Sequence, residues 1–407
     1  MKIVEINNGI TAPKGFLSSG IHCGVKEGYN KKDLALIYSK IPCTAAGVYT
    51  SNKVKGAPIL VCKKHLNNDT AQAIIANSGN ANTCNGDDGV SKAEKMTELA
   101  ASALKINNED VLVASTGVIG LPLNIDAIAS GVPSLVKSLS ETGSDDTANA
   151  IMTTDTVKKE MAVTFKIGEK DVTLGSISKG SGMIEPNMCT MLSFITTDVK
   201  IDASLLKEAL TEAVNVSYNR VSVDGDMSTN DTVLILANGL AENNIINSKN
   251  EDYYNFLEAL KYVTVKLSKQ VAKDGEGATK LIQCTMTGAK TEEDALKLSK
   301  SVINSSLVKA AMFGCDANWG RILCAMGYAD AFFYPQKVNV YFESNQGSII
   351  VCKDGSSVNF DEDLALKILK EDEVLIKVEL NIGDAEITTW GCDLTYDYVK
   401  INGDYRS

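Results

Sequence analysis

Segments with the apolar pattern of strands and segments with that of helices alternate along all 407 residues. Residues 203–220 and 252–272 place apolar side chains at helical spacing, whereas 231–239 is a short apolar run typical of a buried strand. Residues 162–177 alternate apolar and polar side chains on both sides of Gly168, which predicts a hairpin. The alternation predicts an α/β or α+β protein.

Further elements follow from the same patterns. The length favours two or more packed units, and a domain change near residues 280–290 is expected although no linker marks it. The expected helices are 92–105, 124–139 (interrupted near Pro133), 291–308 and 360–370. The expected strands are 111–116, 191–201, 281–289, 337–344, 347–355 and 373–383.

Composition excludes several classes of function. The net charge of −11 argues against nucleic acid and against an anionic membrane surface as partners. No apolar run reaches the roughly 18 residues of a membrane span, and the first residues lack the regions of a signal peptide. We therefore expect a cytoplasmic protein. The ten cysteines form no CxxC pair, which favours reduced thiols, mostly buried.

Histidine is nearly absent, and this limits the chemistry. With only His22 and His65, a histidine-rich metal site is excluded, and a catalytic pair must use one of the two. His65 follows two lysines, which predicts a surface position. His22 adjoins Cys23, but neighbouring residues point apart on a strand, so a structural role is favoured over a catalytic pair.

Three polar loops contain glycine. The Asn/Gly stretch 77–89 is typical of a turn. Segment 222–232 has the acidic residues of a calcium loop, but Thr229 and Ile235 stand where that loop needs Gly and Glu, so we reject a calcium site. Segment 114–120 follows a strand and lacks a nucleotide-binding pattern. There a threonine hydroxyl and a backbone N–H are candidates for stabilising an oxyanion, with an ordinary turn as the alternative.

A fourth stretch, KGSGMIEPNMCTMLSF (179–194), directs a glycine- and proline-restricted path into Cys189-Thr190. A hydroxyl after a strained peptide bond can attack the preceding carbonyl, and hydrolysis of the resulting ester frees a new N-terminus. An N-terminal amine titrates near pH 7.7–8.0, so it can act as the base for its own side chain. Local chemistry alone favours an ordinary strand-edge threonine, and both readings stay open at this point.

Motifs along the whole chain decide between these readings. KGSGMIEPNMCTMLSF resembles the self-cleavage signature of the ornithine acetyltransferases (glutamate N-acetyltransferases) of arginine biosynthesis. NSGNANTCNG, ASTGVIG, AIMTTDT, VSVDGDMSTNDT, KDGEGATKL, FGCDANWGRI and WGCDLTYDYVKINGDYRS resemble further motifs of that family, in the family's order. Several long motifs in register are far more specific than any one alone.

The resemblance implies a self-cleaving α/β protein: a layered αββα nucleophile domain (about 1–282) and a smaller C-terminal α/β domain (about 283–407) whose tail returns to the active site. Cleavage at Cys189–Thr190 gives chains 1–189 and 190–407, expected as an α2β2 heterotetramer. Thr190 then carries acetyl from N-acetylornithine to glutamate in a ping-pong cycle, and no cofactor or metal is implied. The implied oxyanion hole is Thr116 and Gly117. The implied substrate contacts are Thr153 (with Thr154 as the neighbour it could be confused with), Lys179, Thr190, Glu276, Asn402 and Ser407.

Some points stay open at the level of sequence. Cys189 stands where the family usually has alanine, and Ser407 ends the chain where threonine is common; both replacements keep size or hydroxyl. Acetyl-CoA is a possible second donor. The competing hypotheses are a self-cleaving amidohydrolase or aminopeptidase with the same nucleophile, and a metabolite-binding protein that is not cleaved.

Overall fold

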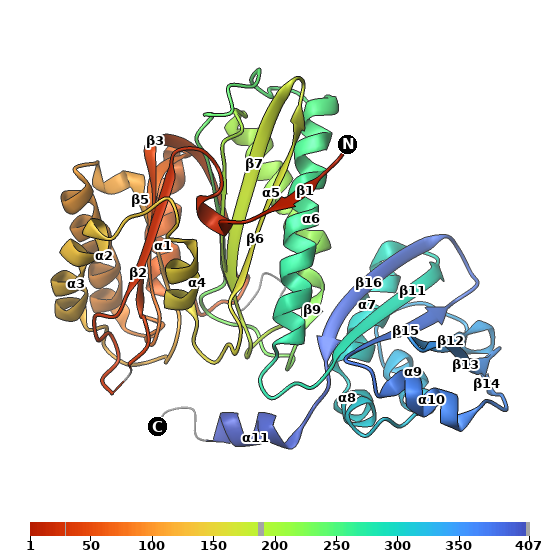
Figure 1. The fold of residues 1–407 in the computed structure, drawn as a ribbon. Coiled ribbons are helices and arrows are strands. Elements are labelled where there is room, and N and C mark those ends of the chain that lie inside the picture. Colours follow the sequence, from red (N-terminus) through yellow and green to blue (C-terminus); the bar gives the residue numbers. More distant parts are fainter. Residues whose placement is uncertain (29, 186–190, 404–407) are drawn as a thin grey trace. The chain divides into compact units, whose positions relative to one another are not determined.

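The computed structural model describes residues 1–28, 30–185 and 191–403, which form two compact units (Figure 1). The first unit comprises Met1–Gly180, Pro186–Asn219 and Met227–Leu267, and the second comprises Ser181–Glu185, Arg220–Asp226 and Ser268–Ser407. The domain change expected near residues 280–290 falls on a strand of the second unit. Division of the chain at residue 189 stays a prediction.

The first unit is built on one nine-stranded mixed sheet of order β1-β6-β7-β8-β10-β3-β4-β5, with β2 paired to β3. The expected hairpin is confirmed, because β6 and β7 pair antiparallel from Lys159 opposite Ser178 to Ile167 opposite Lys170. In the centre, β8 pairs antiparallel with β7 and parallel with β10, and β10 pairs antiparallel with β3. The strands are β1 (Val4–Ile6), β2 (Phe16–Ile21), β3 (Leu34–Tyr49), β4 (Thr70–Asn77), β5 (Val111–Ser115), β6 (Lys159–Ile167), β7 (Lys170–Lys179), β8 (Leu192–Thr197) and β10 (Thr232–Ala237).

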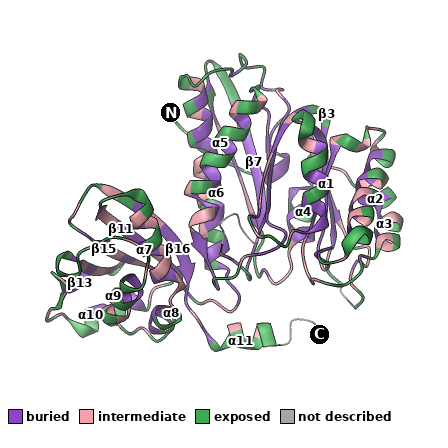
Figure 2. Cartoon of the chain, turned by 180° about the vertical axis from the view of Figure 1, so that it is seen from behind, coloured by how far each residue is buried: buried purple, intermediate pink, exposed green. Residues whose placement is uncertain are grey.

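Two groups of helices bury the sheet in two hydrophobic cores. Helices α1–α4 contribute to one core, and α5 with α6 contributes to the other. On α5 the buried residues are Leu206, Ala209, Leu210, Ala213 and Val214, one face at helical spacing, and Figure 2 shows this face in purple. The helices are α1 (Ala57–His65), α2 (Gly86–Leu104), α3 (Ile125–Lys137), α4 (Ser144–Ile151), α5 (Ala203–Val216) and α6 (Glu251–Lys273), the last of which extends into the second unit.

The second unit has a seven-stranded sheet of order β14-β13-β12-β15-β11-β16-β9 and its own core. Its strands are β9 (Val221–Ser222), β11 (Leu281–Ala289), β12 (Asn339–Ser344), β13 (Gly347–Lys353), β14 (Ser356–Ser357), β15 (Glu373–Glu379) and β16 (Ala385–Cys392). Its helices are α7 (Glu292–Asn304), α8 (Ser306–Phe313), α9 (Trp319–Gly327), α10 (Glu362–Leu369) and α11 (Tyr396–Gly403). The α/β class and the C-terminal α/β unit are therefore confirmed.

Three local predictions were wrong. Helix α3 is continuous through Pro133, because Ile128, Val132 and Leu135 anchor its buried face on both sides of the proline. The helix expected over 291–308 is two helices, since Ser305 is extended and its side chain caps α8 by accepting the Val308 N–H. His65 is 3% exposed, and its ring hydrogen-bonds to the Val111 carbonyl, so it packs in the core.

No helix in the described part of the chain is long and apolar enough to cross a membrane.

Candidate functional site

Lys179, the last residue of β7, brings three of the predicted site residues together in the first unit. Its side chain is buried, and Nζ donates to Thr153 Oγ1 at 2.9 Å and to Thr116 Oγ1 at 3.5 Å. Of the two neighbouring threonines considered from the sequence, Thr153 is the one that accepts this hydrogen bond. A polar cluster therefore forms from segments that are far apart in sequence: the ends of β5 and β7 and the segment after α4.

Asp155 neutralises part of the positive charge at this point. Its Oδ1 accepts hydrogen bonds from Lys159 Nζ at 2.8 Å and from the Gly180 N–H at 2.7 Å, and its Oδ2 lies 3.7 Å from Lys179 Nζ. Burial alone would raise the pKa of this carboxyl, but the two ammonium groups and the hydrogen bonds outweigh burial and hold it well below its usual range. Two lysines around one carboxylate leave the three-residue group with one net positive charge.

The loop after β5 has a backbone that requires glycine. Gly117 has φ +133°, and a Cβ placed there would come within 2.3 Å of the Gly79 carbonyl carbon. The flanking N–H groups of Thr116 and Val118 donate to the carbonyls of Asn77 and Gly79, which fixes the loop against the Asn/Gly stretch. The position predicted for the oxyanion hole is thus a rigid turn beside Lys179.

Asn230 anchors this loop, although it was not among the residues singled out from the sequence. Its Nδ2 donates to the carbonyls of Ala81 and Ser115 at 2.5 and 2.9 Å. Its Oδ1 accepts from the hydroxyls of Thr83 and Thr229 at 2.6 and 2.5 Å. The stretches read from sequence as a turn (77–89) and as a rejected calcium loop (222–232) therefore support the candidate site. The signal that could have revealed Asn230 is its place in a dense polar motif.

Two further predicted residues meet in the second unit. Glu276 is 6% exposed, its N–H donates to the Ser181 carbonyl at 2.9 Å, and its Oε2 accepts from Asn402 Nδ2 at 2.7 Å. A Cβ on Gly182 would come within 2.3 Å of Glu276 Oε2, so glycine permits this close approach. Helix α11 thus brings Asn402 to Glu276, whereas the return of the tail to the active site stays a prediction.

The C-terminal tail contains Tyr396, Tyr398 and Tyr405, and the two that the structure describes differ in their contacts. Tyr398 donates from its hydroxyl to Asp224 Oδ2 at 3.3 Å, whereas Tyr396 is 84% exposed and contacts the Phe313 ring edge-on. Thr190, Cys189, Ser407 and Tyr405 lie outside the described residues.

The alternative nucleophile pair is disfavoured by its surroundings. Burial, together with the nearby Asp33 carboxylate, raises the pKa of the Cys23 thiol to about 12, so the reactive thiolate is scarce at neutral pH. The His22 ring faces the Lys31 carbonyl and Asp33. Within residues 1–28, 30–185 and 191–403, no group of three or more His, Cys, Asp or Glu side chains is arranged to hold a metal ion.

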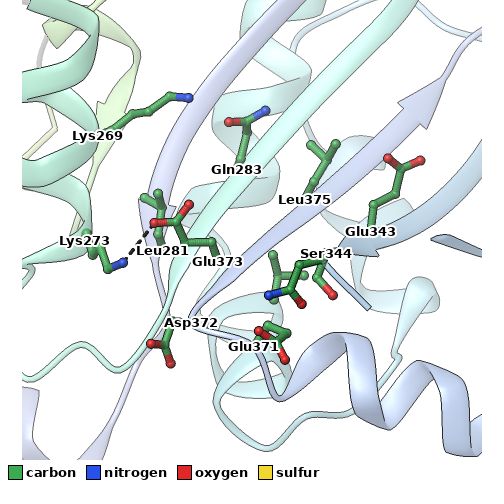
Figure 3. Close-up of a pocket in the computed structure, with 12 residues that line it drawn as sticks. Lys269, Lys273, Leu281, Gln283, Glu343, Ser344, Glu371, Asp372, Glu373 and Leu375 are labelled. Atoms are coloured by element: carbon green, nitrogen blue, oxygen red, sulfur yellow. Dashed lines mark hydrogen bonds and ion pairs between the residues drawn. The ribbon is translucent and has the colours of Figure 1, made fainter. Parts of the chain in front are cut away.

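A cavity of about 540 Å³ is lined by residues of the second unit. Figure 3 shows Lys269 and Lys273 on one side of it and Glu343 and Glu371 on the other. Lys273 pairs with Glu373 at 2.9 Å. Because none of the predicted site residues that the structure describes lines this cavity, we do not assign the candidate site to it.

The chain has an α/β fold, and the described residues Lys179, Thr153 and Thr116 form a polar group at the ends of its strands. The model of the ArgJ family matches residues 17–407, and the chain belongs to this family. Family membership confirms the resemblance stated from the motifs.

Relatives match over almost the entire chain. The arginine biosynthesis bifunctional protein ArgJ 1 of Clostridium acetobutylicum is 54% identical over 401 residues, covering 98% of both chains. The arginine biosynthesis bifunctional protein ArgJ of Caldanaerobacter subterraneus subsp. tengcongensis is 50% identical over 405 residues, covering 99% of this chain and 100% of that protein. Among solved structures, the ArgJ bifunctional protein of Bacillus halodurans is 44% identical with a TM-score of 0.50, covering 53% of this chain and 99% of that one.

Proposed function

We propose that the chain is an ornithine acetyltransferase that cleaves itself at Cys189–Thr190 and moves acetyl from N2-acetyl-L-ornithine through Thr190 to L-glutamate. The bifunctional arginine biosynthesis relatives support the reaction class and favour a second activity with acetyl-CoA as donor. The same relatives disfavour the aminopeptidase alternative.

The buried group of Lys159, Asp155 and Lys179 is the observation that carries the proposal. Both amino-acid substrates bear an α-carboxylate, and a buried group with one net positive charge attracts such an anion more strongly than an exposed lysine would. Thr153 and Thr116 add hydroxyls at the same point.

Each step of the transfer has a chemical group to perform it. The Thr190 amine takes the proton of its own hydroxyl, whose oxygen bonds to the acetyl carbon. Charge develops on the acetyl oxygen, and donors in the Thr116–Gly117 turn stabilise it. The amine then returns the proton to the departing nitrogen of ornithine. Glutamate reverses these steps on the acetyl ester. Glu276, placed beside Asn402, supplies a carboxylate for the side-chain ammonium of ornithine.

A denaturing gel and a donor panel test the proposal. We expect two bands, with the second chain beginning TMLSF, and one uncleaved, inactive band for Thr190→Ala. Incubation with N-acetylornithine and glutamate should yield N-acetylglutamate, and intact mass should show acetyl on chain 190–407. Free acetate without N-acetylglutamate would establish a hydrolase instead. A single full-length band that retains activity would rule out the N-terminal nucleophile. Replacing N-acetylornithine by acetyl-CoA decides whether the enzyme has one donor or two.

A further inference from the structure

A single buried carboxylate lies beside two of the predicted substrate contacts in the first unit. Asp155 lies between α4 and β6, and its Oδ2 accepts the Thr153 N–H at 3.1 Å and lies 3.7 Å from Lys179 Nζ. Its Oδ1 accepts the N–H of Gly180, the residue after Lys179, at 2.7 Å. Asp155 therefore holds the main chain next to each contact residue, and it also holds the charged end of Lys179.

The two lysines of this group contact the carboxylate in different ways. The β6–β7 hairpin places Lys159 and Lys179 at the same end of the sheet. Lys159 Nζ hydrogen-bonds to Asp155 Oδ1 at 2.8 Å, whereas 3.7 Å is beyond hydrogen-bond distance for Lys179 Nζ. The Lys179 ammonium donates instead to the hydroxyls of Thr153 and Thr116. Asp155 thus attracts this ammonium by charge while its N–H groups point to the hydroxyls of the candidate site.

The position of the Lys179 ammonium depends on this carboxylate. Two buried ammonium groups that share one carboxylate repel each other, and without the carboxylate their repulsion would displace one side chain. A lysine has a flexible four-carbon side chain, so charge alone does not fix where its ammonium lies. Recognition of a small ligand needs binding groups held within about 0.5 Å. Fixing Lys179 therefore calls for a rigid, buried partner such as Asp155.

We propose that Asp155 is a positioning residue for recognition of the α-carboxylate of the amino-acid substrate. It holds the Lys179 ammonium and the Thr153 main chain in place, and it acts through them rather than on the substrate. The inference rests on the proposed function, since that proposal makes Lys179 and Thr153 substrate contacts. The competing explanation is a purely structural ion pair that stabilises the fold.

Two ligands that differ only in the α-carboxylate distinguish these explanations. Putrescine is ornithine without that group, so the ratio of their Kd values measures what the carboxylate contributes to binding. Calorimetric titration of the purified enzyme gives both constants and does not depend on turnover. The wild type should bind L-ornithine about 10- to 100-fold more tightly than putrescine, the range expected for hydrogen bonds to a charged group.

Asp155→Asn keeps the size of the side chain and removes its charge. The preference for ornithine should fall about tenfold or more, because the Lys179 ammonium is no longer held in place. A purely structural role predicts a lower Tm and an unchanged ratio of the two Kd values. The ratio therefore reports positioning separately from stability.

Asp198→Asn is the matched control. Asp198 is also buried in the first unit, and it accepts the N–H groups of Thr173 and Lys14 at 2.8 and 3.2 Å. None of these three is a predicted site residue, so Asp198→Asn should lower the Tm and leave the ratio within about twofold of the wild type.

A double variant separates position from charge. Asp155→Asn/Lys159→Met removes one negative and one positive charge, so the group keeps its single net positive charge without the repulsion between two lysines. Positioning predicts that the preference for ornithine stays low in this variant, whereas charge balance alone predicts that the wild-type ratio returns. If Asp155→Asn does not fold, the double variant provides the measurement.

The outcomes separate the two levels of the argument. A wild type that does not favour ornithine over putrescine overturns the role of the Lys179 ammonium in the proposed function. If the wild type favours ornithine and a folded Asp155→Asn keeps or raises that preference, only the role of Asp155 is overturned. A double variant with the wild-type ratio also contradicts the inference, because it would show that net charge alone determines binding.

Discussion

Replacing Asp155 with alanine removes the carboxylate between the buried ammonium groups of Lys159 and Lys179. The Lys159–Asp155 pair has 0% side-chain exposure on both partners, and Lys179 is 5% exposed. Removing one partner of a buried pair costs about 3–5 kcal/mol, because the remaining charge stays buried without compensation. A folding free energy of about 5–15 kcal/mol makes this a large fraction of stability.

Thermal unfolding at pH 7 measures the effect. In domains of this size, each kcal/mol of lost unfolding free energy lowers the Tm by about 2–4 °C. Asp155→Ala should therefore lower the Tm of the first unit by roughly 6–20 °C. The control is Asp145→Ala, which removes an exposed ion pair with Lys158 and should change the Tm by less than about 2 °C. An Asp155→Ala Tm within about 2 °C of the wild type would refute the reasoning.

The pH dependence of that difference has a definite sign. The pKa of Asp155 is lowered in the folded state, so its contribution is complete above the unfolded value of about 3.9 and is lost as pH falls toward the folded value. The Tm difference between wild type and Asp155→Ala should therefore be constant from pH 7 to about 5 and shrink below pH 4. A difference that grows on acidification would contradict this assignment.

Three more changes probe the site. Gly117→Ala should lower kcat about 100-fold, because the new Cβ collides with the Gly79 backbone. Gly120→Ala shares the positive φ but meets no neighbouring atom, so it tests strain without a collision and should keep kcat within a few-fold. Equal losses of kcat in the two variants would contradict this reasoning. Asn230→Ala should lower the free energy of unfolding by about 2–4 kcal/mol, because it leaves buried carbonyls and hydroxyls without partners. Urea denaturation measures this change, and a decrease below about 0.5 kcal/mol would be inconsistent with the network. Glu276→Gln should raise KM for N-acetylornithine about 10- to 100-fold and KM for acetyl-CoA far less. An equal rise in KM for both donors would show that Glu276 does not recognise the ornithine ammonium.

Much of the fold follows from local pattern. The hairpin around Gly168 and helices α5 and α6 could be predicted, because their apolar periodicity decides which face is buried. The splitting of α7 from α8 and the passage of α3 through Pro133 could not, since a single serine cap and tertiary packing decided them.

The site was predictable only in part. Lys179, Thr153 and Thr116 were named from the family motifs, and the structure brings them together. Asp155 and Asn230 were missed, because their importance comes from contacts across long stretches of sequence, such as Asn230 with the Ser115 carbonyl. His65 was misplaced for a related reason: flanking lysines describe the surface of α1, while the ring points the other way, into the core.

The strand order of the first unit determines what a cut at Cys189–Thr190 would do to the molecule. Strands β8 and β10, from downstream of the cut, lie between β7 and β3, from upstream of it. The two polypeptides would be joined by main-chain hydrogen bonds at two strand pairs, β7–β8 and β10–β3. The two chains would therefore stay associated after cleavage. Neither piece could complete the sheet alone, because the upstream piece would lack its middle and the downstream piece its flanks. Such a cleavage would therefore have to follow folding, and two separately synthesised pieces should associate during folding rather than dock as finished parts.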